Sequence, residues 1–372
     1  MDLLEHQGKA LLRRYGIPVP DGSLWPERPN APGGYVVKAQ VAAGGRGKAG
    51  GIHFAEDSAA ADALARGLLD RKIGGHRVDA ILIERRLDIR REDYLAVALD
   101  RDRRCLTLVH ALGGGVEVES LPPEALTRVP VDPLIRLRDF HIARVLEAAK
   151  VEGETRRAYG EVVRALYRLV VAEDATLAEV NPLALTADGG VIAADAKVTL
   201  DDNARFRRDT PDDGDAQAAA ASTLEQSLRA TGAVGVEVDP DGDVVAVVSG
   251  AGLMMATLDL LVERGHKVRA VVDLGGTVLA GGEVLARVFA AVAAAGPRLT
   301  LLNAFMQTAL CDEFARMLVQ AQEMSPLRGR VVIRLKGRQA DEGRRLLVER
   351  GFQVHEDLVP ALDGLADAAR GR

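Results

Sequence analysis

Short β-branched runs alternate with amphipathic segments through the last third of the chain. The apolar runs are 244–248, 268–272, 298–302 and 330–335, and the segments with helical spacing are 253–264, 283–295, 310–323 and 339–350. In the third of these segments the apolar residues fall on one face, as core-facing residues do. The alternation predicts a parallel sheet covered by helices on both faces, in the doubly wound, flavodoxin-like α/β class.

The earlier part of the chain has a mixed pattern. Helical spacing predicts helices over 4–15, 57–71, 139–149 and 154–172. Runs rich in β-branched residues predict strands over 35–39, 79–84, 93–99 and 105–110, with a hairpin around 187–190. This mixture lacks the regular alternation seen later, and it is typical of an α+β domain.

Two segments rich in acidic residues, Pro and Gly separate these patterns. They are 209–215 and 238–243, with a helix expected between them at about 215–230. Such segments bury too little apolar surface to order themselves. We therefore expect two domains, 1–235 and 236–372.

Composition narrows the classes of protein. The 372 residues are 48% hydrophobic and 27% charged, which suffices for more than one core without disulfides, and the two cysteines indicate a reducing compartment. A formal charge of −6 disfavours nucleic acid as a partner. The N-terminus lacks the apolar core of a signal peptide, and the apolar runs are shorter than the ~20 residues that cross a bilayer. We expect a cytoplasmic protein without a nucleic-acid or membrane partner.

The segment 41–51 carries five glycines and two cations, Arg46 and Lys48. Glycines let backbone N–H groups approach phosphate oxygens, and the cations balance the charge. Lys38 lies just upstream on a predicted strand and is a further candidate for phosphate contact. The spacing is not that of a Walker loop, and an ordinary glycine-rich turn between strands is the alternative.

A second candidate site combines Glu179, Asn181 and Asp195. Residues two apart on a strand share a face, and a hairpin would bring Asp195 alongside. Carboxylate and amide oxygens suit magnesium that bridges nucleotide phosphates. The alternative is a hairpin with ordinary outward polar residues, but the phosphate-type loop upstream favours the metal site.

Three weaker candidates lie at predicted strand ends. Glu84 ends one predicted strand, and Glu92 follows a charged segment. Carboxylates at these positions can accept hydrogen bonds from ribose hydroxyls, and the alternative is that they belong to a solvated charged connection. The segments 249–252 and 273–277 lead from strands into helices, where free N–H groups can hold an anion or glycine can serve only the turn. The seven histidines show no metal-ligand spacing, and no Gly-x-Ser-x-Gly elbow occurs.

Taken in order, these motifs resemble the β subunit of succinyl-CoA synthetase over nearly the whole chain. The matching motifs are 4–9 (LEHQGK), 15–18 (YGIP), 37–40 (VKAQ), 44–51 (GGRGKAGG), 179–183 (EVNPL), 195–197 (DAK) and 250–253 (GAGL). The resemblance implies an ATP-grasp domain followed by a flavodoxin-like domain, in an ADP-forming acid–CoA ligase. Family members pair with an α subunit that binds CoA and carries a histidine phosphorylated during the cycle.

The resemblance also implies roles for single residues. ATP phosphates would be held by Lys38, Gly44, Gly45, Arg46, Gly47 and Lys48, and the adenosine end by Glu84 and Glu92. Asn181 and Asp195 would bind Mg²⁺, and Glu179 would orient the phosphohistidine. Positioning and charge neutralisation supply most of the acceleration in such phosphoryl transfer.

The motifs of the acid-binding half depart from the family pattern. Ser249 stands where the family usually has Asn before Gly250, and Asn303-Ala304-Phe305-Met306-Gln307-Thr308 stands where it usually reads Asn-Ile-Phe-Gly-Gly-Ile. The predicted substrate-binding residues are Ser249, Gly250, Asn303, Met306 and Gln307. Because Met306 and Gln307 add bulk where glycine exposes backbone, we expect a small carboxylic acid other than succinate. A malate–CoA ligase β subunit and a non-catalytic nucleotide-binding partner of an α-like chain are the alternatives.

Overall fold

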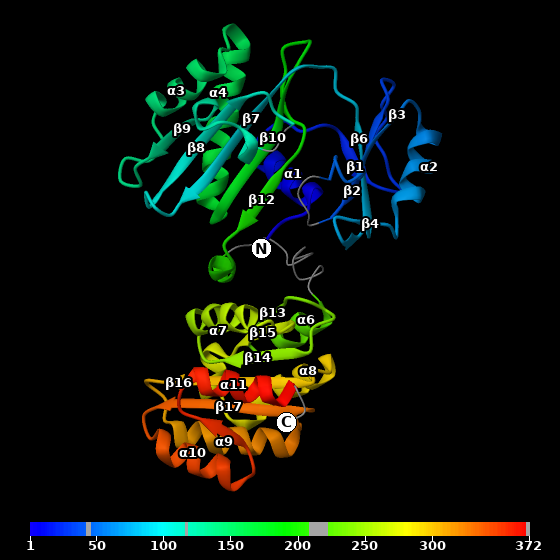
Figure 1. Cartoon of the computed structure of the whole chain (residues 1–372). Coiled ribbons are helices and arrows are strands. Elements are labelled where there is room, and N and C mark those ends of the chain that lie inside the picture. The colour runs from blue at the N-terminus through cyan, green and yellow to red at the C-terminus, as the bar shows by residue number, and fades with distance from the viewer. Residues whose placement is uncertain (42–45, 116–117, 208–221, 370–372) are drawn as a thin grey trace. The chain divides into compact units, whose positions relative to one another are not determined.

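A computed structural model describes residues 1–41, 46–115, 118–207 and 222–369 and divides the chain into two compact units, Met1–Ala220 and Ala221–Arg372 (Figure 1). The division lies before the expected boundary at 235. Helix α6 (Thr223–Arg229) and strand β13 (Val234–Glu237) belong to the second unit, because Leu224 and Leu228 pack in its core. The acidic segment 209–215 lies outside the described residues.

The first unit contains two main sheets. The smaller sheet has the antiparallel order β1 (Gly22–Leu24), β6 (Ala80–Arg85), β2 (Tyr35–Gln40), β3 (Ile52–Ala55). The larger sheet has the order β11 (Val191–Ala193), β10 (Ala175–Thr186), β7 (Ile89–Asp100), β8 (Cys105–Leu112), β9 (Thr127–Val131), with β12 (Lys197–Leu200) also paired to β10. A two-stranded ribbon is formed by β4 (Lys72–Ile73) and β5 (His76–Arg77).

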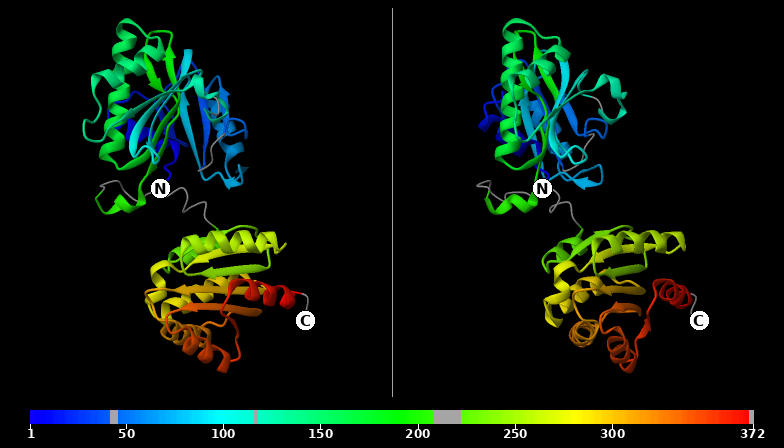
Figure 2. Two further views of the ribbon diagram at one scale, coloured as in Figure 1. Left: turned by 60° about the vertical axis from the view of Figure 1, so that its left-hand side comes forward. Right: turned by 90° about the vertical axis from the view of Figure 1, so that its left-hand side faces the viewer.

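Helices cover one face of each main sheet. Helix α2 (Ser58–Leu68) begins where the Asp57 carboxylate accepts a hydrogen bond from Ala60 N at 2.8 Å, and its alanines pack on the smaller sheet. Helices α3 (Asp139–Ala149) and α4 (Gly153–Ala172) cover the larger sheet (Figure 2), where Tyr159 and Leu166 are fully buried. On the opposite face of the larger sheet, a small apolar cluster forms around Tyr94 and is packed by Val118 and Leu121, which follow β8.

Helix α1 (Glu5–Arg14) connects the two sheets. Leu11 and Leu12 pack in the core of the larger sheet, while the Cβ position of Gly8 lies 3.4 Å from Ala196 Cβ. The acidic and basic residues of its first two turns point instead toward β2 and β6 of the smaller sheet. The predicted helices over 4–15, 57–71, 139–149 and 154–172 and the hairpin around 187–190 are confirmed.

The second unit has a doubly wound sheet. Its order is β13, β15 (Val268–Asp273), β14 (Val244–Val248), β16 (Leu299–Met306), β17 (Arg330–Gly337), β18 (Gln353–His355). The last five strands are parallel and follow the 2-1-3-4-5 order of flavodoxin-like folds, whereas β13 is antiparallel at the edge. The predicted fold class is therefore confirmed.

Helices lie on both faces of this sheet. One face is covered by α7 (Ala251–Glu263) and α11 (Leu358–Ala369), and the other by α6, α8 (Gly282–Ala295), α9 (Cys311–Met324) and α10 (Ala340–Glu349). Figure 2 shows the red helix α11 on the side of the sheet away from α8 and α9. Short 3₁₀ turns are η1 (Val118–Ser120), η2 (Pro123–Ala125), η3 (Asp202–Arg207) and η4 (Gly275–Leu279). Within the described ranges, no helix is both long enough and apolar enough to span a bilayer.

Sequence patterns did not predict several short elements. Strand β18 has three residues, all half-buried, so it offers no apolar run. Strand β13 alternates Val with Gly and Glu, and it gains its place from pairing with β15. Strand β16 also extends past the predicted end at 302 to Met306, which changes the orientation of the residues that follow Asn303.

Candidate functional site

Six charged side chains meet where α1, the smaller sheet and the connection between β11 and β12 come together. We call them the charge cluster. They are Glu5 and Lys9 of α1, Lys38 of β2, Arg46 after β2, Glu84 of β6 and Asp195 before β12. Four of them are residues predicted from the sequence to contact nucleotide or metal.

Glu5 lies at the centre of the charge cluster. Its carboxylate is within 2.7 Å of Lys38 Nζ, 2.8 Å of Lys9 Nζ and 2.9 Å of Arg46 Nη1, and its side chain is 0% exposed. Burial by itself would raise the pKa of Glu5, but Lys38, Lys9 and Arg46 outweigh burial and hold that pKa well below its ordinary value. Glu5 is therefore an ionised carboxylate shared by three cations.

Glu84 is the second carboxylate that the lysines share. Lys9 Nζ lies 2.6 Å from Glu84 Oε1, and Lys38 Nζ lies 2.8 Å from Glu84 Oε2. Both ammonium groups also donate to Ala194 O at 2.7 Å. Burial would lower the pKa of Lys38, but Glu5 and Glu84 raise it above its ordinary value, whereas burial leaves the pKa of Lys9 lowered.

Arg46 and Asp195 close the charge cluster on its third side. Arg46 Nη2 donates to Asp195 Oδ1 at 2.9 Å and to Oδ2 at 3.0 Å. Burial and the charge of Glu5 raise the pKa of Asp195, while Arg46 opposes that rise. Three carboxylates balance three cations, so Lys38 and Arg46 can hold phosphate only by exchanging carboxylate partners.

A second group of polar residues lies on the face of the larger sheet opposite α3 and α4. Tyr94 Oη of β7 donates to Glu179 Oε2 of β10 at 3.2 Å. Further along, Asn181 Oδ1 accepts a hydrogen bond from Gly115 N at 2.7 Å. Glu92 is half-buried, and burial raises its pKa. Predicted residues Glu92, Glu179 and Asn181 are thus gathered along β7 and β10.

The loop after β8 lies against these residues. Gly113 N and Gly114 N donate to Glu92 O at 3.1 Å and 2.8 Å. Gly115 has a φ of +75°, and a Cβ there would lie 2.8 Å from Glu92 Oε2. Only glycine fits this close approach without displacing the carboxylate.

The hairpin brings Asn181 and Asp195 to opposite positions. Leu183 pairs with Ala193, and Ala194 N donates to Pro182 O at 3.0 Å, so the register continues to Asn181 opposite Asp195. One amide oxygen and one carboxylate, completed by water and phosphate oxygens, fit Mg²⁺, which seldom takes an all-protein cage. Among the described residues, no group of three His, Cys, Asp or Glu side chains suited to a metal occurs.

Two further predicted phosphate contacts lie on the turn that follows β2. Gly47 and Lys48 are exposed on that turn, and Gly51 N, donating to Arg46 O at 2.8 Å, closes it. Gly44 and Gly45 lie outside the described residues. The turn therefore presents Lys48 at its surface and Arg46 toward the charge cluster.

At the carboxyl ends of strands in the second unit, polar contacts tie neighbouring loops together. Asp273 Oδ1 accepts hydrogen bonds from Gly250 N at 2.7 Å and Gly275 N at 2.9 Å. Ser249 Oγ accepts one from Phe305 N at 2.9 Å. Gly250, with a φ of +128°, is the residue before α7 and occupies a conformation that favours glycine.

The structure changes the picture of two predicted substrate-binding residues. Met306 is 3% exposed and packs in the core, so its side chain does not narrow a surface pocket. Asn303 is fully buried, where its amide donates to Thr257 Oγ1 at 2.8 Å and accepts from Arg334 Nη1 at 3.3 Å. Of the two residues expected to add bulk at the acid site, Met306 is buried and Gln307 is exposed.

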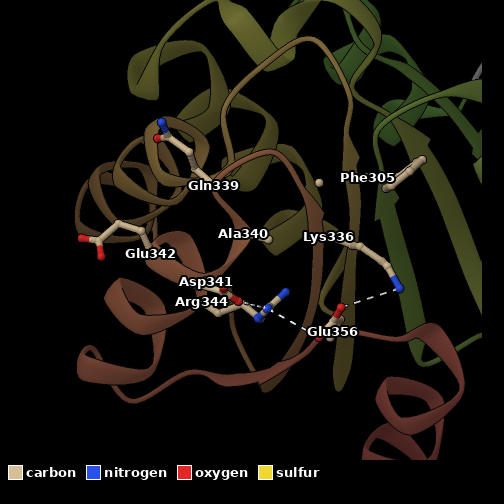
Figure 3. A pocket seen from close by; sticks show the side chains of 9 residues that line it. Phe305, Lys336, Gln339, Ala340, Asp341, Glu342, Arg344 and Glu356 are labelled. Carbon is tan, nitrogen blue, oxygen red and sulfur yellow. Dashed lines mark hydrogen bonds and ion pairs between the residues drawn. The ribbon is translucent and has the colours of Figure 1, made fainter.

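A pocket of about 570 Å³ lies beside these strand ends (Figure 3). Its basic residues are paired, since Glu356 lies 3.7 Å from Lys336 Nζ and 3.5 Å from Arg344 Nη2. It contains none of the residues predicted from the sequence. The residues that line it are Phe305, Lys336, Gly337, Gln339, Ala340, Asp341, Glu342, Arg344 and Glu356.

Comparison with known proteins identifies the family. The ATP-grasp domain family matches residues 2–185, and the CoA-ligase family matches residues 247–364. Subunit beta 2 of the succinate–CoA ligase [ADP-forming] of Streptomyces coelicolor is 38% identical over 99% of this chain and 96% of its own length. The chain belongs to the β subunits of ADP-forming succinate–CoA ligases.

Other similar proteins agree. The corresponding subunit beta of Rubrobacter xylanophilus is 38% identical to this β subunit and spans 100% of the chain and 97% of its own length. The structure of ATP citrate lyase from Methanothrix soehngenii superposes with a TM-score of 0.73 at 19% identity over 95% of each chain, a likeness of fold. Membership confirms the predicted order of ATP-grasp and CoA-ligase domains and the class of ADP-forming acid–CoA ligase, and it implies an α-subunit partner and the use of ATP.

Sequence reasoning missed several residues at the sites of this β subunit. Glu5 and Lys9 stood within a motif used only for the resemblance, although their spacing of four on a helix puts both on one face. The glycine run 113–115 begins three residues after the predicted strand 105–110, which was an available signal. Tyr94 lies inside a buried run, and nothing in its sequence context distinguishes it from a core residue.

Proposed function

We propose that this β subunit, paired with an α subunit, uses ATP to phosphorylate a histidine of that partner, which then yields an acyl phosphate and an acyl-CoA. The charge cluster is the observation that supports this proposal, because three cations and three carboxylates converge on the motifs that the family uses for nucleotide. In this scheme the partner would carry the histidine that receives the phosphoryl group and would bind most of the CoA.

Lys38, Arg46 and Asp195 of the charge cluster have tasks in this scheme. Lys38 and Arg46, with Lys48 and the backbone of Gly44, Gly45 and Gly47, hold the phosphates. Arg46 transfers from Asp195 to phosphate oxygens, which frees the Asp195 carboxylate. Its guanidinium remains charged throughout, as phosphate recognition requires.

Metal, adenosine and histidine fall to the remaining residues. Asn181 and Asp195 would hold Mg²⁺, which when bound neutralises charge on the phosphates. Glu84 and Glu92 serve the adenosine end, and Glu179 orients the phosphohistidine. The charge balance then follows from exchange of partners rather than from burial of new unpaired charge.

We also propose that the acid is a small carboxylic acid other than succinate. Malate is the nearest alternative to succinate. Ser249 supports this. Its side chain is shorter than the asparagine that the family usually has at this position, and its hydroxyl accepts a hydrogen bond from Phe305 N. Gln307 is the exposed residue next to it in the acid half.

The test uses the chain co-expressed with its α subunit. Labelled ATP should give an acid-labile, base-stable label on the partner, and Asp195→Ala should abolish it while the protein remains folded. Bound nucleotide without label in the wild-type complex would favour a non-catalytic partner. A panel of carboxylic acids, scored by CoA-dependent ADP release, identifies the acid, and strong preference for succinate would contradict the proposed specificity.

A further inference from the structure

Tyr94 is a buried tyrosine on the face of the larger sheet opposite α3 and α4. Its side chain is 6% exposed and packs with Ala96 and Ala111 in a small apolar cluster. The hydroxyl donates to Glu179 Oε2 at 3.2 Å. The ring is held by packing while its polar end reaches one particular carboxylate oxygen.

Strand register explains this contact. Glu179 of β10 pairs with Ala96 of β7, so Tyr94 lies two residues further along the neighbouring strand and on the same face. Diagonal neighbours of this kind lie roughly 7–8 Å apart at their backbones, a span that an aromatic side chain can bridge. Figure 1 shows β7 and β10 side by side. Neither residue needs a flexible loop to hold this geometry.

We propose that Tyr94 is a positioning residue for Glu179, holding its carboxylate in the orientation used during phosphoryl transfer to the partner histidine. This proposal rests on the proposed function, in which Glu179 orients the phosphohistidine. A carboxylate on a strand has several accessible rotamers, and a hydrogen bond from a packed hydroxyl selects among them. Small displacements of a group that aligns reacting atoms cost large factors in rate.

The opposite face of the same sheet carries a matched tyrosine–carboxylate pair. Tyr159 Oη donates to Asp93 Oδ2 at 3.3 Å, and Arg91 Nη2 lies 2.8 Å from the same oxygen. Asp93 is 0% exposed and lies beneath α4, so it meets no substrate. Tyr159→Phe is therefore a control for Tyr94→Phe. Both variants lose a hydrogen bond from a tyrosine hydroxyl to a carboxylate, but only Tyr94→Phe loses the one to Glu179.

The experiment compares Tyr94→Phe with Tyr159→Phe in the complex with the α subunit. In single-turnover labelling of the partner histidine with labelled ATP, Tyr94→Phe should slow transfer by roughly 10- to 100-fold. Its KM for ATP and its thermal midpoint should stay near the wild-type values, because the ring is retained and water can replace the lost hydroxyl at Glu179, which is only half-buried. In Tyr159→Phe the ring is also retained, but the fully buried Asp93 loses a hydrogen-bond donor. Tyr159→Phe should lower the thermal midpoint and leave the transfer rate unchanged.

A double-mutant cycle tests whether Tyr94 acts through Glu179. In a Glu179→Gln background, Tyr94→Phe should cause no further loss of rate. An equal loss in both backgrounds, or a wild-type rate in Tyr94→Phe, would overturn the positioning role alone. A wild-type complex that leaves the partner unlabelled would overturn the proposed function and this inference together.

Discussion

The charge cluster of the first unit and the strand-end loops of the second unit hold their polar groups in different ways. In the charge cluster, buried side chains of opposite charge bind one another, with Glu5 shared by three cations. In the strand-end loops, backbone N–H groups of Gly250 and Gly275 meet at Asp273, and Ser249 binds the backbone of Phe305.

This difference determines how each site tolerates change. A buried charge loses its compensation when its partner is removed, so each residue of the charge cluster depends on the others. A backbone N–H remains in place whenever the chain conformation is preserved. We therefore expect substitutions in the charge cluster to lower the free energy of unfolding far more than substitutions in the strand-end loops do.

The largest expected effect comes from Glu5→Ala. It leaves Lys9, Lys38 and Arg46 with one buried carboxylate fewer and should lower the unfolding free energy of the first unit by about 3–5 kcal/mol. The single tryptophan, Trp25, lies in the first unit, so its fluorescence during urea unfolding reports on that unit.

The control for this substitution is Glu56→Ala. Glu56 forms an exposed ion pair with Arg86 at 3.2 Å, and pairs of this kind contribute little. Equal unfolding midpoints for the two variants would show that a buried carboxylate of the charge cluster contributes no more to stability than an exposed one. The expected difference in sensitivity between the two units would then have no basis.

A smaller effect is expected from acid. The pKa of Glu5 is lowered below its ordinary value of 4.5 in the folded chain, so its contribution to stability is present above that value and is lost as pH falls through the folded pKa. Urea unfolding followed by Trp25 fluorescence from pH 7 down to about 3 should show this loss in the wild type.

Glu5→Gln should flatten that decline, because the variant has no carboxylate to protonate. Asp195 acts in the opposite sense, since its raised pKa makes protonation favour the folded chain. An acid profile of Glu5→Gln as steep as that of the wild type would assign the decline to other groups.

The smallest effect is expected in the second unit, from Ser249→Ala. Loss of the hydrogen bond between Phe305 N and Ser249 Oγ should reduce the local opening free energy by about 0.5–1.5 kcal/mol. Hydrogen exchange of the Phe305 amide should therefore accelerate by roughly 2- to 13-fold. As a control, Ser227→Ala removes a hydroxyl on the exposed side of α6 and should leave the exchange rate of the Phe305 amide unchanged. If Ser249→Ala accelerated this exchange by more than about 13-fold, the strand-end loops would be more sensitive to substitution than expected, and the contrast between the two units would fail.

Motifs predicted four of the six residues of the charge cluster. Lys38 was placed on a predicted strand, Glu84 at the end of another and Asp195 on the returning strand of a hairpin, and the structure brings all three into one cluster. Met306 shows where this reasoning ends. The strand continues past 302, so alternation turns Met306 into the core beside Ala304 and turns Phe305 outward.

The sequence by itself determined the two-part architecture, the alternation of strands and helices after 244, and the family. Periodic burial and ordered motifs are local properties, and they are written along the chain. Only the tertiary structure decided which charges face one another. Glu5 meets Lys38 across 33 residues, and Arg46 meets Asp195 across 149, because sheets and a helix from distant segments pack together. Ion pairing depends on distances of a few ångströms in space, which separation along the chain does not specify.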